Sequence, residues 1–129
     1  MVYDESMNNK VYNILENIKY RYNLFIGDKS IHKLTIFLGG FECGLKECLD
    51  EYIPFDTQFQ IFIENKRKIC CPTKHWSNIL LENISQEEAF DLFFVYLEEF
   101  KQIMKTPKVL DNMYYENIKN VEDWIATDD

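Results

Sequence analysis

Glycines in the stretch FIGDKSIHKLTIFLGGFECGL, at residues 25–45, are the first candidates for chemistry. Gly39 and Gly44 have the spacing of a phosphate-binding loop, in which backbone amides and a lysine converge on the same phosphates. Leu45 occupies the place of that lysine, and Glu47 follows the displaced lysine where a hydroxyl residue would hold magnesium. Because a carboxylate there repels phosphate, we reject a phosphate loop and predict a helix.

The cysteines and histidines give little support for a metal site or for nucleophilic catalysis. Cys70, Cys71 and His75 lie close together, but a structural zinc site needs four converging ligands, and His32 is the only other imidazole. No nucleophile elbow or paired cysteine and histidine signature is present. We interpret His75, beside Trp76, as a satisfied histidine on a helix surface. The sequence therefore predicts no enzyme, no cofactor and no metal.

Carboxylates within the glycine-containing helix could also do acid and base chemistry or hold a divalent metal. Glu42, Glu47 and Asp50 lie mostly on the side away from the apolar residues of that helix. We interpret them as a solvated face.

Apolar residues at helical spacing organise the first half of the chain. A first helix is predicted from residue 7 to about 22, capped by Asp4, with an apolar face of Met7, Val11, Ile14 and Ile18. A second is predicted after Asp28, its cap, on a stripe of Ile31, Leu34, Leu38, Phe41, Leu45, Cys48 and Tyr52.

The glycines then need an explanation other than phosphate binding. Gly40 and Gly44 are four residues apart, so we expect them on one helix face, where a neighbouring helix can approach closely. Gly27 is interpreted as a turn.

Residues 55–65 are ambiguous, because their alternation fits an edge strand while their phenylalanines fit a helix capped by Asp56. We favour the helix, since a lone strand could not satisfy its backbone. A basic loop follows at residues 66–68, and Thr73 is predicted to cap a helix carrying Trp76, Ile79 and Leu80.

The clearest local signal is ISQEEAFDLFFVYLEEF, where Ser85 and Glu88 form a capping box. A helical projection gives a core face of Ala89, Phe93, Leu97, Phe100 and Met104. The opposite face carries Glu88, Asp91, Val95 and Glu98. Pro107 ends this helix, and Asp111 is predicted to cap a last one with an apolar face of Tyr114, Ile118, Val121 and Ile125.

These elements predict an all-α fold, a single compact bundle of about five or six helices over residues 1–129, with a polar tail from about residue 126. The amino terminus does not resemble a secretory signal, and no stretch is long and apolar enough for a membrane span, so we expect a cytoplasmic protein. The four cysteines, Cys43, Cys48, Cys70 and Cys71, are then reduced thiols.

Charge indicates the kind of partner. The net charge of −8 and isoelectric point of about 4.8 disfavour direct contact with nucleic acid or an anionic membrane and favour basic partners. Clustered carboxylates can simply keep a protein soluble. They can also steer a basic partner into place. On the second interpretation the partner-binding residues are Glu88, Asp91, Val95, Glu98, Glu99, Glu122 and Asp123.

Residues 21–45, RYNLFIGDKSIHKLTIFLGGFECGL, resemble the amino-terminal motif of small helical immunity proteins from bacterial polymorphic and contact-dependent toxin systems. The motif positions are held by Arg21, Leu24, Phe25, Ile26, Gly27, Ser30, Leu34, Phe37, Gly40 and Phe41. KHWSNIL and SQEEAFDLFFVYLEEF resemble that family's tryptophan segment and aromatic helix.

The resemblance implies a non-catalytic inhibitor of a cognate toxin, with a nuclease as the favoured toxin class. The alternative is an acidic nucleic-acid mimic that blocks a DNA- or RNA-binding protein, and a third possibility is a small enzyme. Arg21 could brace the Gly27 turn or contact a partner, and the sequence leaves both roles open.

Overall fold

A computed structural model describes residues 5–48, 54–69 and 74–127, and within those ranges the chain forms six α-helices and no strand. The helices are α1 (Glu5–Phe25), α2 (Ile31–Cys48), α3 (Phe55–Arg67), α4 (Trp76–Leu80), α5 (Gln86–Ile103) and α6 (Lys108–Thr127). The predicted all-α fold is confirmed, and α3 decides the ambiguity over residues 55–65 in favour of a helix.

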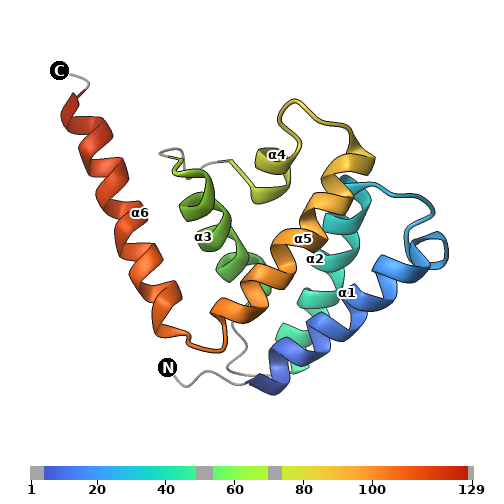
Figure 1. Ribbon diagram of the computed structural model, residues 1–129. Helices are drawn as coiled ribbons and strands as arrows, with labels where there is room; N and C mark the ends of the chain where they lie inside the picture. Colours follow the sequence, from blue (N-terminus) through green and yellow to red (C-terminus); the bar gives the residue numbers. More distant parts are fainter. Residues whose placement is uncertain (1–4, 49–53, 70–73, 128–129) are drawn as a thin grey trace.

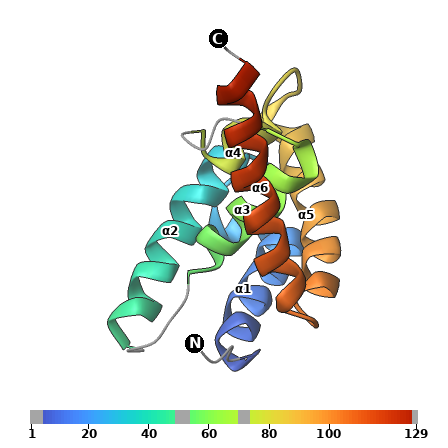
Figure 2. The same cartoon turned by 90° about the vertical axis from the view of Figure 1, so that its left-hand side faces the viewer.

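The helices pack so that α3 and α5 lie in the middle of the molecule. Figure 1 shows α6 and α1 on opposite sides, with α3 and α5 between them. The view in Figure 2 agrees, because α6 lies in front of α3 and α1 lies behind. Helix α3 contacts both α6 and α4, while α5 contacts α2 and α4.

Aromatic side chains from α3, α4 and α5 form the centre of the core. The Phe59 ring lies 5.0 Å from the Trp76 ring and 5.2 Å from that of Phe93, measured between centroids. Phe100 approaches Phe59 at 5.4 Å, so α5 meets α3 through several edge-to-face pairs, each worth about 0.5–1.5 kcal/mol beyond burial. The predicted core face of α5 is confirmed, since Ala89, Phe93, Leu97, Phe100 and Met104 are all buried.

Helix α2 buries only the first part of its predicted stripe, and its glycines do not serve close packing. Ile31, Leu34 and Leu38 are buried, and Phe41 and Leu45 are half-buried against the core. Cys48 is exposed, and Tyr52 lies outside the described residues. Gly40 and Gly44 lie on the opposite side, and a Cβ added to either would meet nothing within 4 Å. Their interpretation as a close helix contact is therefore wrong.

The turn predicted at Gly27 is confirmed. Its φ of +91° is one that side-chain-bearing residues rarely adopt. Helix α1 extends beyond its predicted end to Phe25, and the backbone at Arg21 departs from helical geometry with φ −133° and ψ 38°. Arg21 itself is exposed.

Several predicted helix caps are wrong. Helix α2 is capped by Ser30, whose Oγ accepts a hydrogen bond from the Lys33 amide at 3.2 Å, while Asp28 forms an ion pair with Lys33 instead. Asp56 does not cap α3, which Pro54 precedes without a side-chain cap bond. Asp4 and Thr73 lie outside the described residues.

At α5 the capping serine is confirmed. The Ser85 Oγ accepts from the Glu88 amide at 3.1 Å, and the same hydroxyl donates to the Glu88 carboxylate at 3.1 Å.

The last helix begins at Lys108, so Asp111 lies inside its first turn rather than at its cap. Leu110 and Asn117 are buried, but Tyr114 and Ile118 are exposed, and that part of the predicted apolar face is wrong. The side chain of Asn117 explains the rotation, because it donates to the Ile61 carbonyl of α3 at 3.1 Å and accepts from Asn65 at 3.2 Å. The side chains of Val121 and Ile125 lie outside those described.

Candidate binding groove between α1 and α5

A surface groove runs between α1 and α5, which pack antiparallel. Tyr22 of α1 contacts Phe90 near the start of α5, with ring centroids 5.8 Å apart, and the Lys101 ammonium near the end of α5 lies 5.2 Å from the centre of the Tyr12 ring. Between these contacts lies a cavity of about 550 Å³, lined by Lys19, Tyr20, Lys29, Phe90, Asp91, Phe94, Val95 and Glu98.

The spacing of residues on α5 explains why the groove has an aromatic floor and a polar edge. Phe90 and Phe94 are four residues apart and buried, so their rings form the floor. Asp91, Val95 and Glu98 follow one another at helical spacing on the exposed side of the same helix. We call these three residues the α5 lip.

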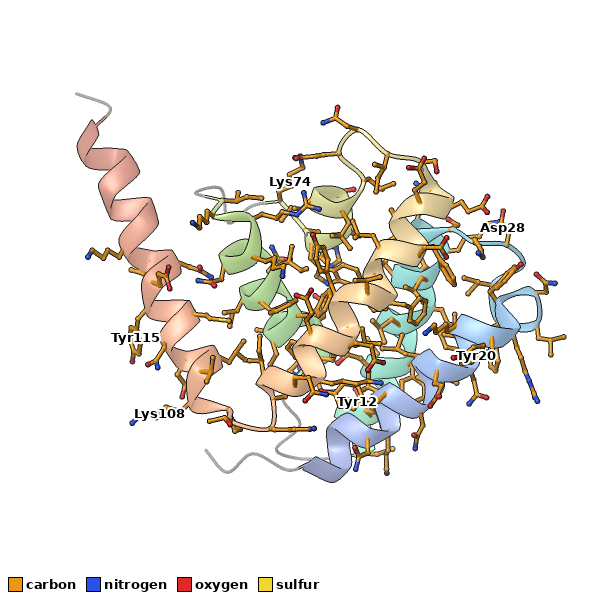
Figure 3. All side chains as sticks on the ribbon, in the orientation of Figure 1. Tyr12, Tyr20, Asp28, Lys74, Lys108 and Tyr115 are labelled. Carbon is orange, nitrogen blue, oxygen red and sulfur yellow. The ribbon has the colours of Figure 1, made fainter. Side chains whose placement is uncertain are left out.

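Two large apolar side chains remain in solvent at the groove. Tyr20 of α1 is 69% exposed and Val95 of the α5 lip is 58% exposed. Figure 3 labels Tyr20 on α1, on the side of the molecule where α1 lies next to α5. Exposed apolar groups beside a buried aromatic floor are typical of surfaces that bind another molecule.

One end of the groove is closed by an ion pair. The Lys29 ammonium lies 3.2 Å from the Asp91 carboxylate and 5.8 Å from the centre of the Tyr22 ring. The hydrogen bond and the charge of Asp91 raise the pKa of Lys29, so the lysine keeps its charge.

The structure brings together some of the predicted partner-binding residues and separates others. Asp91, Val95 and Glu98 meet on the α5 lip, and Glu88 lies just before them in the first turn of α5. Glu99 faces the other way and pairs with Lys66 of α3. Glu122 and Asp123 belong to α6, which lies on the opposite side of the molecule from α1 (Figure 1), and their side chains are outside those described.

Sequence reasoning missed the lysines that neutralise part of this acidic face. Asp91 pairs with Lys29, and Glu98 lies 3.3 Å from Lys101 on the same helix. The second pair could have been read from its spacing of three residues, whereas the first depends on the tertiary fold. Such exposed pairs each contribute about 0–1 kcal/mol, so a partner can replace them at little cost.

A second polar cluster lies where α3 meets α4. The His75 ring lies between Ser77 Oγ, 2.7 Å from its Nδ1, and Asp56 Oδ1, 2.8 Å from its Nε2. The Ser77 amide also donates to Nδ1, so Nε2 carries the proton toward Asp56. Trp76 donates its indole N–H to the same carboxylate oxygen at 2.8 Å.

This cluster has the order of a serine, histidine and aspartate triad, but its bonds serve the fold. Ser77 is only 7% exposed, and His75 caps α4 through the Ser77 amide. The neighbouring backbone amides are engaged as well, since Trp76 N donates to Gln60 Oε1 at 2.7 Å and Ser77 N donates to His75 Nδ1 at 3.2 Å. His75 is therefore satisfied, as expected, although it precedes the helix as its cap.

Asp56 is held in its ionised form by this cluster. Burial raises its pKa, but the hydrogen bonds that it accepts from His75 and Trp76 lower the pKa by more, so the pKa lies below the ordinary value.

A buried carboxylate on α2 was also missed. Glu42 is only 6% exposed, and it accepts hydrogen bonds from the amides of Phe55 at 2.6 Å and Asp56 at 3.0 Å. Its assignment to a solvated face is wrong, because its carboxylate caps α3 in place of a local side chain. Glu47 is exposed as predicted, and Asp50 lies outside the described residues.

Other kinds of site are not apparent in the described part of the chain. No group of three histidine, cysteine or acidic side chains there could hold a metal ion, and Cys70 and Cys71 lie outside that part of the chain. None of the described helices has the length and hydropathy to cross a membrane.

Fold and site together define a six-helix all-α domain, over the described residues, with a groove between two antiparallel helices. No family model matches the chain, and comparisons with curated proteins and with solved structures find no significant match.

Proposed function

We propose that this chain is an immunity-like protein that binds and neutralises a cognate bacterial toxin, a nuclease being the favoured class. The observation that carries the proposal is the α5 lip, where Val95 is exposed between two carboxylates beside an aromatic floor. Protein interfaces commonly combine a desolvated apolar centre with a charged rim. The immunity-like motif at residues 21–45 supports the same class of function.

Inhibition would occur by occlusion. The α5 lip would lie over the basic cleft in which the toxin binds nucleic acid, so that substrate is excluded and no bond need be made or broken. The net charge of −8 would accelerate the encounter with a basic surface. Arginines of the toxin could replace Lys29 and Lys101 at Asp91 and Glu98, because the existing pairs are exposed.

The nucleic-acid mimic remains the alternative, but the observed contacts favour it less. A mimic presents carboxylates at phosphate spacing, whereas Asp91, Glu98 and Glu99 each contact a lysine of this chain. These pairs reduce the continuous negative potential that such mimicry needs.

Co-purification with the product of the neighbouring gene tests the proposal most directly. A stable complex that abolishes the toxic activity of that product is the expected result. Absence of any complex, with both proteins folded, would count against the assignment.

Charge reversal tests the surface itself. We expect E88K/D91K/E98K to lower the association rate constant about tenfold at low salt while the far-ultraviolet circular dichroism stays unchanged. The matched control E47K/D111K/E116K makes the same change in net charge at exposed carboxylates elsewhere. Equal association rates for the two triple variants, measured by stopped flow, would remove the α5 lip from the interface.

A further inference from the structure

The groove contains one charge that the fold leaves without an opposite partner. Lys29 pairs with Asp91 and Glu98 pairs with Lys101, but Lys19 makes no ion pair within the described residues. Its ammonium instead lies 5.3 Å from the centre of the Tyr20 ring and 6.0 Å from that of Phe94. The α1 side of the groove therefore presents an accessible cation.

The opposite side of the groove presents an accessible anion. Glu98 belongs to the α5 lip, and its pair with Lys101 joins residues three apart on an exposed helix surface, which is a weak arrangement. The exposed side chains of Tyr20 and Val95 also line the groove, one on each helix, beside the floor formed by Phe90 and Phe94. The surface is thus basic on the α1 side, apolar in the middle and acidic on the α5 side.

This order of charges determines which molecules can bind across both the α1 side and the α5 side of the groove. An occupant that spans both sides fits best when it places an anion at Lys19 and a cation at Glu98. A second copy of the chain carries both charges in the same order. When two copies are related by a two-fold axis that runs along the groove, the α1 side of each faces the α5 side of the other, so every contact is made twice.

We propose that this chain forms a weak two-fold homodimer through the α1–α5 groove, in which Lys19 of each copy pairs with Glu98 of the other. Tyr20 of one copy packs on Val95 of the next, over the floor formed by Phe90 and Phe94. Because each copy contributes only one charge pair and one pair of exposed apolar side chains, the dissociation constant should be about 10–100 µM.

The dimer does not depend on the proposed toxin inhibition, but it would affect it. Val95 and Glu98 belong both to this surface and to the α5 lip proposed to bind the toxin. Dimer and toxin complex would then exclude each other, so the apparent affinity for the toxin would fall as the fraction of dimer rises.

Sedimentation velocity over a range of protein concentrations tests the proposal without any toxin, at about 0.15 M salt, where the like net charges of −8 on the two copies are largely screened. The wild-type protein should pass from monomer to dimer as concentration rises. K19E and E98K should each raise the dissociation constant about tenfold, because each creates two like-charge contacts in a symmetric dimer. The double variant K19E/E98K should recover dimerisation, since the two charges have exchanged sides.

Matched controls separate this pairing from net charge. K119E and E116K make the same charge changes at exposed positions of α6 and should leave the dissociation constant unchanged. V95D should weaken the dimer and should not be rescued by either charge change. Thermal melts of each variant would confirm that the fold is kept.

Two outcomes would overturn the proposal. A wild-type protein that stays monomeric up to millimolar concentration has no such dimer. A dimer that K19E does not weaken, or that K19E/E98K fails to restore, uses another surface. Neither outcome bears on toxin binding, which is measured separately with the neighbouring gene product and the triple variants.

Discussion

Removal of the Glu42 carboxylate by Glu42→Ala should destabilise the whole domain, although the residue lies on a helix face that the sequence assigns to solvent. The side chain accepts bonds from two backbone amides at the start of α3, and one of them belongs to the fully buried Phe55. In the alanine variant these amides have no side-chain cap, because Pro54 offers none.

The cost can be estimated from the two bonds. A hydrogen bond to a charged group contributes about 1.5–3 kcal/mol, and an amide that water can reach recovers part of that loss. With the Phe55 amide buried and the Asp56 amide partly accessible, we expect the free energy of unfolding to fall by about 3 kcal/mol. Glu42→Gln keeps one acceptor oxygen and should lose about half as much.

Urea unfolding followed by circular dichroism measures this directly. With a slope of about 2 kcal/mol per molar urea, the midpoint for Glu42→Ala should fall by about 1.5 M. Glu47→Ala on the same helix is the control, because Glu47 is exposed, and its midpoint should hardly move. If both variants lost the same stability, the carboxylate of Glu42 would not be the cap of α3.

The remaining predictions concern pH and the glycines. Because the pKa of Asp56 is lowered on folding, its contribution to stability is complete above the unfolded value of 3.8 and is lost as pH falls through the lower folded value. Asp56→Asn should therefore flatten the fall in unfolding free energy below about pH 4, and an unchanged acid limb would contradict this. Gly40→Ala and Gly44→Ala should each add about 0.5–1 kcal/mol of stability, since the new Cβ is unobstructed. Gly27→Ala should instead lower the free energy of unfolding by about 1 kcal/mol because of its positive φ. Melting temperatures of the three variants that all lie above, or all lie below, that of the wild type would refute this distinction.

Features set by local chemistry were the ones that could be predicted from the sequence. The start of α5 follows from Ser85 and Glu88, and its buried and exposed faces follow from helical periodicity alone. The rejection of a phosphate loop likewise rested on neighbouring residues, and residues 31–48 are indeed helical.

Features that depend on partners distant in the chain could not be predicted in the same way. Glu42 caps a helix that begins 13 residues later, so no local spacing marks it as buried. Asn117 fixes the rotation of α6 by bonding a carbonyl 56 residues away. The exposed side of α5 was a partial signal for the groove, but Lys19 and Lys29 reach it only because α1 and the loop that follows α1 pack against that helix.

The wrong prediction that Gly40 and Gly44 form a close helix contact has a different physical cause. Periodicity places Gly40 and Gly44 on one face, but it does not say whether a neighbour covers that face. The buried residues Ile31, Leu34 and Leu38 define the covered side, and the glycines lie opposite. A missing side chain permits close approach without requiring it.

The contacts at the two ends of the groove have a consequence for recognition. Tyr22 packs on Phe90 at one end, and Lys101 lies over Tyr12 at the other, so α1 and α5 contact each other on both sides of the recess. Gln86 adds a further contact, because its Oε1 accepts a hydrogen bond from the His32 amide at 3.0 Å. This bond joins the start of α2 to the start of α5. A molecule that binds in the groove would therefore meet preformed walls, and little conformational entropy would be lost in ordering them.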